Sequence, residues 1–251
     1  MGKTENLLNS IWFGEKSTLS PSEIKENILK KYKDKIDWLE TLLIQLMNQT
    51  KDETVLNLCI RVFLAVATHD DLKDSNNFRF LSEGTEETIN TFASAAITSL
   101  SLNIIPYLLA LLEEWNEISD TVTIIKDSID FFLDFEECIG EDAIVDEIGD
   151  FYFKYCDEND TESYYFQQNL VFPGDLAKKL IQRVMIAANN EEPLRMEVIP
   201  SLLSIWTGEK VPGDYSTIIS ASNYKNFINY INGLSIKNWE KGQKYFYGYK
   251  L

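Results

Sequence analysis

The sequence contains a single histidine, His69, and this scarcity excludes several classes of catalysis. Ser-His-Asp and Cys-His mechanisms both need a histidine held by an orienting partner. The pair His69-Asp70 resembles a dipeptide of metal-dependent phosphohydrolases, but such sites need further histidines, which this sequence does not contain. We therefore interpret His69 as a structural residue, whose place at the end of a predicted helix suits a cation near a helix C-terminus.

Glycine and cysteine are also few. The 11 glycines form neither a GxxxxGK[ST] nor a GxGxxG pattern, so a phosphate-binding loop is not predicted. Cys59, Cys138 and Cys156 form no CxxC pair and cannot all pair with one another, so we interpret them as reduced thiols packed as small apolar side chains. Such cysteine usage fits a reducing compartment, and we expect a cytoplasmic protein.

A long apolar run is missing as well. The densest apolar stretch, at 97–112, is interrupted by polar residues and by Pro106, and it is too short to span a bilayer. The N-terminus shows no basic region followed by an apolar run, so no secretory signal is expected. We expect a soluble protein without a membrane partner.

Basic residues are scarce in the middle of the chain. Residues 52–163 contain five Lys or Arg and 26 Asp or Glu, a net charge of −21, whereas residues 1–51 carry +1 and residues 164–251 carry +3. Within this block, residues 113–162 hold 18 acidic residues and only two lysines. Binding to nucleic acid or to an anionic membrane depends on cations, so neither is an expected partner.

Apolar residues recur at spacings of three and four along most of the chain, which predicts an all-α protein. Helices are expected at about 20–32, 38–46, 52–66, 85–98, 102–116, 120–137, 140–156, 175–189, 194–205 and 215–232. In the helix expected at 140–156, the apolar register consists of Ile144, Val145, Ile148, Phe151 and Tyr152. We expect a loop at 72–84, a turn or linker at 157–161, and a short strand or extended segment in the tail 239–251, with little strand elsewhere.

An internal echo suggests how the helices are arranged. The segment Ile105-Pro106-Tyr107-Leu108-Leu109 recurs as Ile199-Pro200-Ser201-Leu202-Leu203, and a tryptophan follows each copy. Proline in a first helical turn, followed by a leucine-rich face, is typical of helices stacked in an array. We expect irregular antiparallel helical hairpins stacked like a short α-solenoid of the HEAT type. They would form one domain over 1–251, with at most a loose division near 157–163.

A second echo repeats the pattern W-x-G-E-K. Its first copy contains Trp12, Gly14 and Glu15, and its second copy contains Trp206, Gly208 and Glu209. One interpretation is structural, with an anchoring tryptophan, a glycine that ends a helix and a capping acid. The other is a contact surface, because tryptophan often dominates the binding energy of interfaces. The sequence leaves both open.

The acidic segment 113–162 is the strongest candidate for function. Like charges four residues apart on a helix, such as Asp130 and Asp134, destabilise it, so the cluster either only solubilises the protein or steers a basic partner. We favour a partner-binding role. The candidate residues are Asp134, Glu136, Glu137, Glu141, Asp142, Asp146, Glu147 and Asp150. A Ca²⁺ or Mg²⁺ site is not favoured because there is no DxDxDG loop. We predict no catalytic, cofactor-binding or metal-ligating residue.

Three segments resemble one known family. They are Asn9-Ser10-Ile11-Trp12-Phe13-Gly14-Glu15-Lys16, Trp206-Thr207-Gly208-Glu209-Lys210-Val211-Pro212 and the ending Trp239-Glu240-Lys241-Gly242-Gln243-Lys244-Tyr245-Phe246-Tyr247-Gly248. Together they resemble the immunity proteins of bacterial polymorphic-toxin systems, in particular an all-helical class that is immunity protein 47-like. The acidic middle matches this class only in helical character.

The resemblance implies a small cytoplasmic protein that neutralises a cognate toxin, encoded beside it, by direct binding and without catalysis. The composition agrees with this function independently, since an acidic inhibitor can occupy the basic groove of a toxic nuclease as a phosphate mimic. Two alternatives from other classes stay open. One is an α-solenoid scaffold that bridges other proteins, and the more distant one is a hydrolase that uses a pair of carboxylates.

Overall fold

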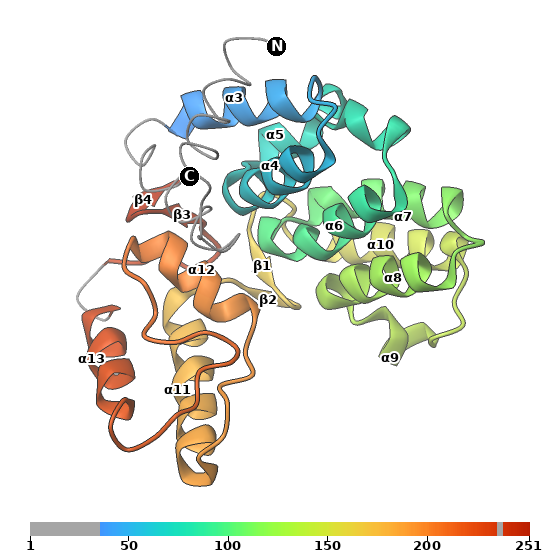
Figure 1. Cartoon of the computed structure of the whole chain (residues 1–251). Helices are drawn as coiled ribbons and strands as arrows, with labels where there is room; N and C mark the ends of the chain where they lie inside the picture. Colours follow the sequence, from blue (N-terminus) through green and yellow to red (C-terminus); the bar gives the residue numbers. More distant parts are fainter. Residues whose placement is uncertain (1–35, 235–237) are drawn as a thin grey trace. The chain divides into compact units, whose positions relative to one another are not determined.

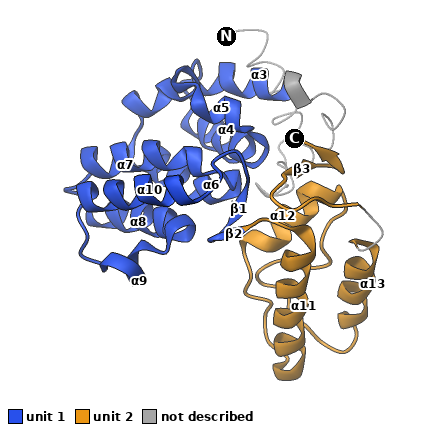
Figure 2. Ribbon diagram, turned by 180° about the vertical axis from the view of Figure 1, so that it is seen from behind, with its two compact units in different colours: residues 1–169 blue, residues 170–251 orange. Residues whose placement is uncertain are grey.

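The computed structural model describes residues 36–234 and 238–251. The helix expected at 20–32 and the first W-x-G-E-K copy, with Trp12, Gly14 and Glu15, lie outside these residues. The chain divides into two compact units, residues 1–169 and residues 170–251 (Figure 2). This boundary follows the linker expected near 157–163, and the single domain over 1–251 stays a prediction.

Unit 1 is a set of helices packed on their neighbours (Figure 1). Its elements are α3 (Ile36–Met47), α4 (Glu53–Val66), α5 (His69–Lys73), the 3₁₀ segment η1 (Ser75–Glu83), α6 (Glu86–Ala96), the 3₁₀ turns η2 (Ile97–Ser99) and η3 (Leu102–Ile104), α7 (Ile105–Glu114), α8 (Ser119–Leu133), α9 (Phe135–Ile139) and α10 (Val145–Glu158). Helix α4 packs against α3 and α6, α8 packs against α6 and α7, and α10 packs against α7. The finer prediction of an α-solenoid stays a prediction.

The helices of unit 1 begin where the sequence provides caps. The side chain of Asp52 accepts a hydrogen bond from the backbone N–H of Val55 at 3.2 Å, and Thr85 does the same for Thr88 at 3.3 Å. Each such bond satisfies one of the N–H groups that a first turn leaves without a helical partner. Below these caps the apolar faces meet in a core that includes the edge-to-face rings of Phe63 and Phe78, 5.9 Å apart.

Unit 2 is smaller and contains three helices among its described residues. These are α11 (Pro173–Asn190), α12 (Val198–Thr207) and α13 (Tyr224–Leu234), and α11 packs against the other two. The tail forms an antiparallel hairpin of β3 (Tyr245–Phe246) and β4 (Tyr249–Lys250), and β3 packs on α12. The short strand expected in the tail is therefore present.

A second hairpin was not expected. Strands β1 (Tyr165–Phe166) and β2 (Asn169–Leu170) pair where unit 1 ends, so the tail does not hold all of the strand, although strand outside the tail is short, as expected. The backbone N–H of Tyr165 donates to the carbonyl of Leu100 at 2.6 Å, which fixes this hairpin to unit 1. Strands of two residues are too short for an alternating pattern, and the turn uses Gln167 at a φ of 57°, so the usual Gly or Asn signal is missing.

The predicted all-α class is confirmed, with corrections to four ranges. The loop expected at 72–84 contains the end of α5 and η1. The helix expected at 120–137 is divided at Asp134, whose φ of 55° ends α8 before α9 begins. The helix expected at 140–156 begins only at Val145, after the left-handed Gly140.

The fourth correction concerns 215–232, where the helix begins at Tyr224. The carboxylate of Asp214 accepts from the backbone N–H of Ser216 at 3.1 Å and from the hydroxyl of Thr217 at 2.8 Å, which holds this stretch in a turn. No helix among the described residues is both long enough and apolar enough to cross a membrane.

Candidate functional site

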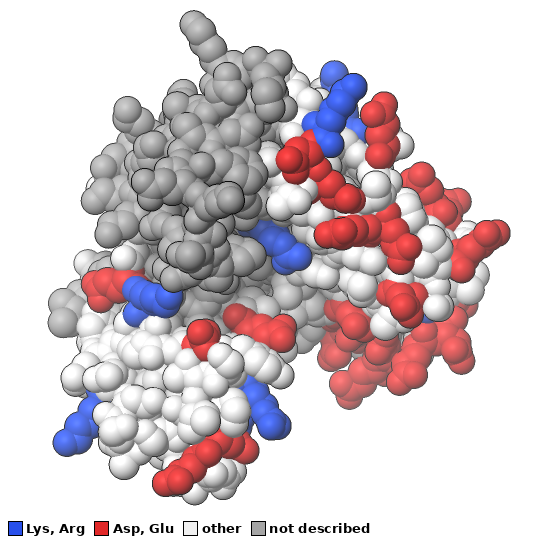
Figure 3. Space-filling view, viewed as in Figure 1, with Lys and Arg blue, Asp and Glu red and all other residues white. Residues whose placement is uncertain are grey.

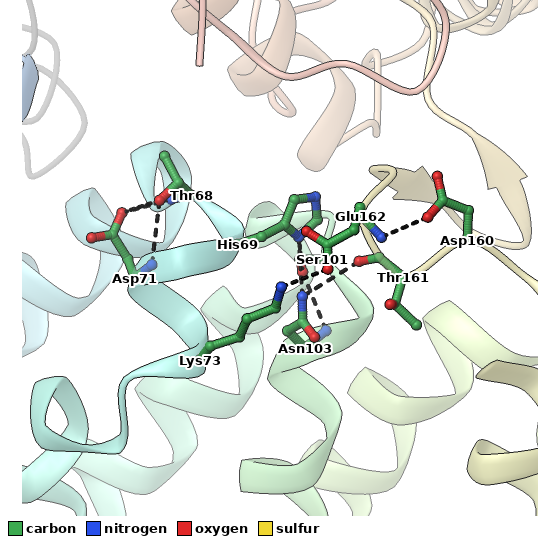
Figure 4. A network of polar contacts seen from close by, with 9 residues as sticks. All are labelled: Thr68, His69, Asp71, Lys73, Ser101, Asn103, Asp160, Thr161 and Glu162. Atoms are coloured by element: carbon green, nitrogen blue, oxygen red, sulfur yellow. Dashed lines mark hydrogen bonds and ion pairs between the residues drawn. The ribbon is translucent and has the colours of Figure 1, made fainter. Parts of the chain in front are cut away.

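His69 is buried and belongs to a polar network inside unit 1 (Figure 4). Asn103 Nδ2 donates to the carbonyl of Thr161 at 3.4 Å, and this amide nitrogen also lies 3.1 Å from His69 Nδ1. Because an amide nitrogen only donates, His69 Nδ1 is the acceptor of that bond. The hydroxyl of Ser101 lies 2.8 Å from the same nitrogen. The network therefore fastens the segment after α10 to the start of α5.

The position of His69 corrects one detail of the sequence interpretation. His69 is the first residue of α5, after the cap Thr68, and not a cation at a helix C-terminus. Helix α4 ends at Val66, as expected, and a new helix starts three residues later behind the cap Thr68. The contacts of His69 support a structural role for this residue.

The acidic residues proposed for partner binding lie on α9, on α10 and in the turns beside them. Glu137, Glu141, Asp142, Asp146, Glu147 and Asp150 are exposed, and Asp134 and Glu136 are half-buried. Carboxylates gather over the side of unit 1 where α8 and α9 lie (Figure 3). We call the eight candidate residues together the acidic face.

Lysine does not neutralise this surface. The side chain of Lys126 on α8 donates to the backbone carbonyls of Glu141 and Ala143, each at 2.9 Å. These bonds hold the turn before α10 against α8, and Lys126 forms no ion pair with a carboxylate of the described residues. The second lysine of the segment, Lys154, is exposed on α10.

The surroundings of Glu136 raise the pKa of its carboxyl group. Desolvation raises the pKa of this carboxyl above its ordinary value, and the negative charges of Asp130, Glu141 and Asp127 raise the pKa further. Lys126 opposes this rise but does not cancel it. The acidic face therefore stores electrostatic repulsion, which a cationic partner would relieve.

One of the candidate carboxylates already has a role within the fold. Glu147 Oε2 accepts a hydrogen bond from the backbone N–H of Ile144 at 3.0 Å, which caps the start of α10. Asp146 and Asp150 lie four residues apart on the outward side of the same helix, opposite the buried Ile148 and Tyr152. The strongest candidates are thus the exposed residues without such a role.

The second W-x-G-E-K copy begins in the core of unit 2 and continues to its surface. Trp206 is fully buried, and its ring lies edge-on to Tyr245 with centroids 6.3 Å apart. Gly208 ends α12 with a φ of 71°, and a Cβ atom there would lie 2.6 Å from the ring of Tyr247. Trp206 and Gly208 therefore shape the fold of unit 2, while Glu209 is exposed.

An open hollow of about 610 Å³ lies between α4 and α6 and is lined by Glu53, Glu87 and Arg61 among others. Its carboxylates hold the two helices together, since Glu53 accepts from Thr88 at 3.4 Å and Glu87 accepts from Asn57 at 3.4 Å. In the part of the chain that the structure describes, no three His, Cys, Asp or Glu side chains are grouped so as to hold a metal ion.

Sequence reasoning missed one residue of the acidic region. Phe153 is 68 % exposed on α10, although a phenylalanine usually turns inward. The available signal was its register: Phe153 is outside the apolar register of this helix and in phase with Asp146 and Asp150.

Comparison with known families gives a match over nearly the whole chain. The sequence model of a family described as Immunity protein 47 matches residues 7–251. No curated protein and no solved structure matches the chain.

Proposed function

The chain belongs to the Immunity protein 47 family, and from this premise we propose that it neutralises a cognate toxin by binding it through the acidic face. Family membership carries the function of immunity against a toxin, and thus a toxin as partner. The proposal adds three points. The acidic face is the surface that binds, the toxin meets it with a basic surface, and binding alone inhibits the toxin without catalysis.

The observation that carries the proposal is the concentration of negative charge on one part of unit 1. Residues 113–162 contain 18 acidic residues against two lysines, and one of those lysines, Lys126, is bonded to backbone carbonyls. A single-sign surface of this kind raises the association rate of an oppositely charged partner. An immunity protein benefits from fast association because the toxin must be captured before it acts.

The test is co-expression in a bacterial host with the toxin whose gene adjoins this one. Wild-type protein should restore growth and should co-purify with the toxin as a complex. A variant that carries Glu141→Lys and Asp150→Lys should protect less at equal expression. Full protection by this variant would refute the acidic face as the binding surface. Absence of any complex with the toxin would refute direct binding.

A further inference from the structure

The outward side of α10 combines three features that do not help the helix to fold. Asp146 and Asp150 are like charges four residues apart, and their repulsion offsets what Asp146 contributes as an acid in the first turn of the helix. Gly149 is a weak helix former in a helix interior. Phe153 exposes most of its ring to water. Their coincidence on one helix suggests selection for something other than stability.

These features share one stripe of the helix surface. Residues three, four and seven positions apart point the same way on an α-helix, so Asp146, Gly149, Asp150 and Phe153 lie beside one another. Asp157, also exposed, extends the stripe by one further turn. The buried residues Ile148 and Tyr152 lie on the other side and hold α10 to unit 1. The stripe thus consists of the apolar ring of Phe153 with carboxylates before and after it along the helix.

The ring of Phe153 is supported from one side. It lies next to Tyr152, with centroids 5.6 Å apart and planes inclined by 49°. Tyr152 is only 7 % exposed, so this contact limits the orientations that Phe153 can adopt. Among the described residues, no other large apolar side chain is as exposed as Phe153. An aromatic side chain held in place before binding is the usual form of an interface anchor.

Gly149 leaves space beside this ring. A Cβ atom built on Gly149 would meet nothing within 4 Å, and its φ is not in the left-handed region. The fold therefore has no need of glycine there, because alanine would fit without a clash. What glycine provides is a shallow step in the helix surface one turn before Phe153, where another chain can approach closely.

We propose that Phe153 is the apolar anchor of the toxin-binding surface and inserts into an apolar pocket of the toxin bordered by Lys or Arg side chains. Charge complementarity selects this occupant, since Asp150 and Asp157 lie one turn before and one turn after Phe153 and Asp146 extends the negative charge, against Lys154 as the one cation of α10. The inference rests on the proposed function and assigns different parts of the binding process to the two kinds of residue. The carboxylates speed association, and Phe153 slows dissociation.

The experiment measures association and dissociation rates with the toxin encoded by the adjoining gene, in a form inactivated at its own active site. Phe153→Ala should raise the dissociation rate at least about tenfold and change the association rate less than about twofold. Phe153→Leu, which keeps part of the apolar contact, should have an intermediate effect. Met185→Ala is the matched control, because Met185 is a half-exposed apolar residue on α11 in unit 2. It should change neither rate by more than about twofold.

The thermal midpoint of each variant separates binding from folding. Because Phe153 is mostly exposed, Phe153→Ala should unfold at the wild-type temperature or above it. A dissociation rate for Phe153→Ala equal to that of Met185→Ala, with wild-type binding intact, would overturn the anchor and leave the proposed function standing. If wild-type protein does not bind the toxin at all, the proposed function fails, and the anchor fails with it.

Discussion

His69 stacks on Tyr164, with ring centroids 4.0 Å apart and planes inclined by 22°. His69 begins α5, whereas Tyr164 follows α10 and directly precedes β1, so the contact joins segments that are far apart in the sequence. The ion pair of Lys73 with Glu162, at 2.5 Å, bridges the same two segments at the surface. The stretch expected to be a linker is therefore fixed to the body of unit 1.

We predict that His69→Ala lowers the free energy of unfolding by about 2 kcal/mol, because it removes the stack and leaves buried polar partners unsatisfied. Urea unfolding would measure this loss. Asp70→Asn, at the exposed neighbouring position, should cost less than about 0.5 kcal/mol. Toxin affinity should be unchanged in both variants, and a loss of affinity in folded His69→Ala would contradict a structural role.

The second prediction concerns the core of unit 2. Trp206→Ala removes a fully buried ring and should cost about 3–5 kcal/mol. Gly208→Ala should also destabilise, since it places a Cβ at a left-handed φ of 71° and against Tyr247. Thermal unfolding of each variant would show these losses. Ser201→Ala, at an exposed position of α12, is the control and should change stability by less than about 0.5 kcal/mol.

The sequence was informative where a pattern is local. Helical spacing located most helices, and the acidic segment was recognised from composition alone, because charge and periodicity are properties of neighbouring residues. The role of Trp206 was left open because burial depends on the hairpin at Tyr245–Phe246, some forty residues later. Local patterns do not show which distant segment will cover a tryptophan.

The same limit explains two of the errors. His69 looked like a helix end because its network partners, Ser101, Asn103 and Tyr164, lie more than 30 residues away. The predicted helix at 140–156 started too early because Lys126, on another helix, holds residues of this stretch in a turn. In each case a long-range hydrogen bond or ring contact decided the structure.

Glu136 provides a prediction about pH. Because its pKa in the folded protein is raised, mainly by desolvation and then by the nearby carboxylates, folding favours the protonated form. The penalty is absent at pH values below the ordinary pKa, grows as the pH rises from the ordinary pKa to the raised one, and is complete above the raised pKa. Glu136→Gln should therefore raise the thermal midpoint at pH 7 and have little effect at pH 3. An equal shift at both pH values would show that the effect is not electrostatic.

The negative charge of the acidic face should increase the rate at which the protein associates with the toxin. Replacing Glu141 and Asp150 by lysine should slow association with the toxin about tenfold or more at low salt, with a smaller change in dissociation. The difference should shrink as salt rises, since the screening length falls from about 10 Å at 0.1 M to about 3 Å at 1 M. Stopped-flow kinetics at several salt concentrations would measure this.

The matched control for this experiment makes the same change of charge elsewhere. Glu83→Lys with Glu197→Lys reverses two exposed acids outside the acidic face. If this control slows association as much as the Glu141 and Asp150 reversals do, only total charge matters and the acidic face has no special role.

Gly149 allows stability and binding to be separated at one position. Gly149→Ala should raise the free energy of unfolding by about 0.5–1 kcal/mol, because alanine is the better helix former and its methyl group meets no atom within 4 Å. Gly149→Leu should keep the helix equally well, but its side chain would fill the step beside Phe153. We therefore expect the leucine variant to bind the toxin at least about tenfold more weakly while it unfolds no more easily than wild type. Urea unfolding and toxin titration of both variants would measure the two effects. Tight binding by Gly149→Leu would mean that no part of the toxin approaches this turn of α10.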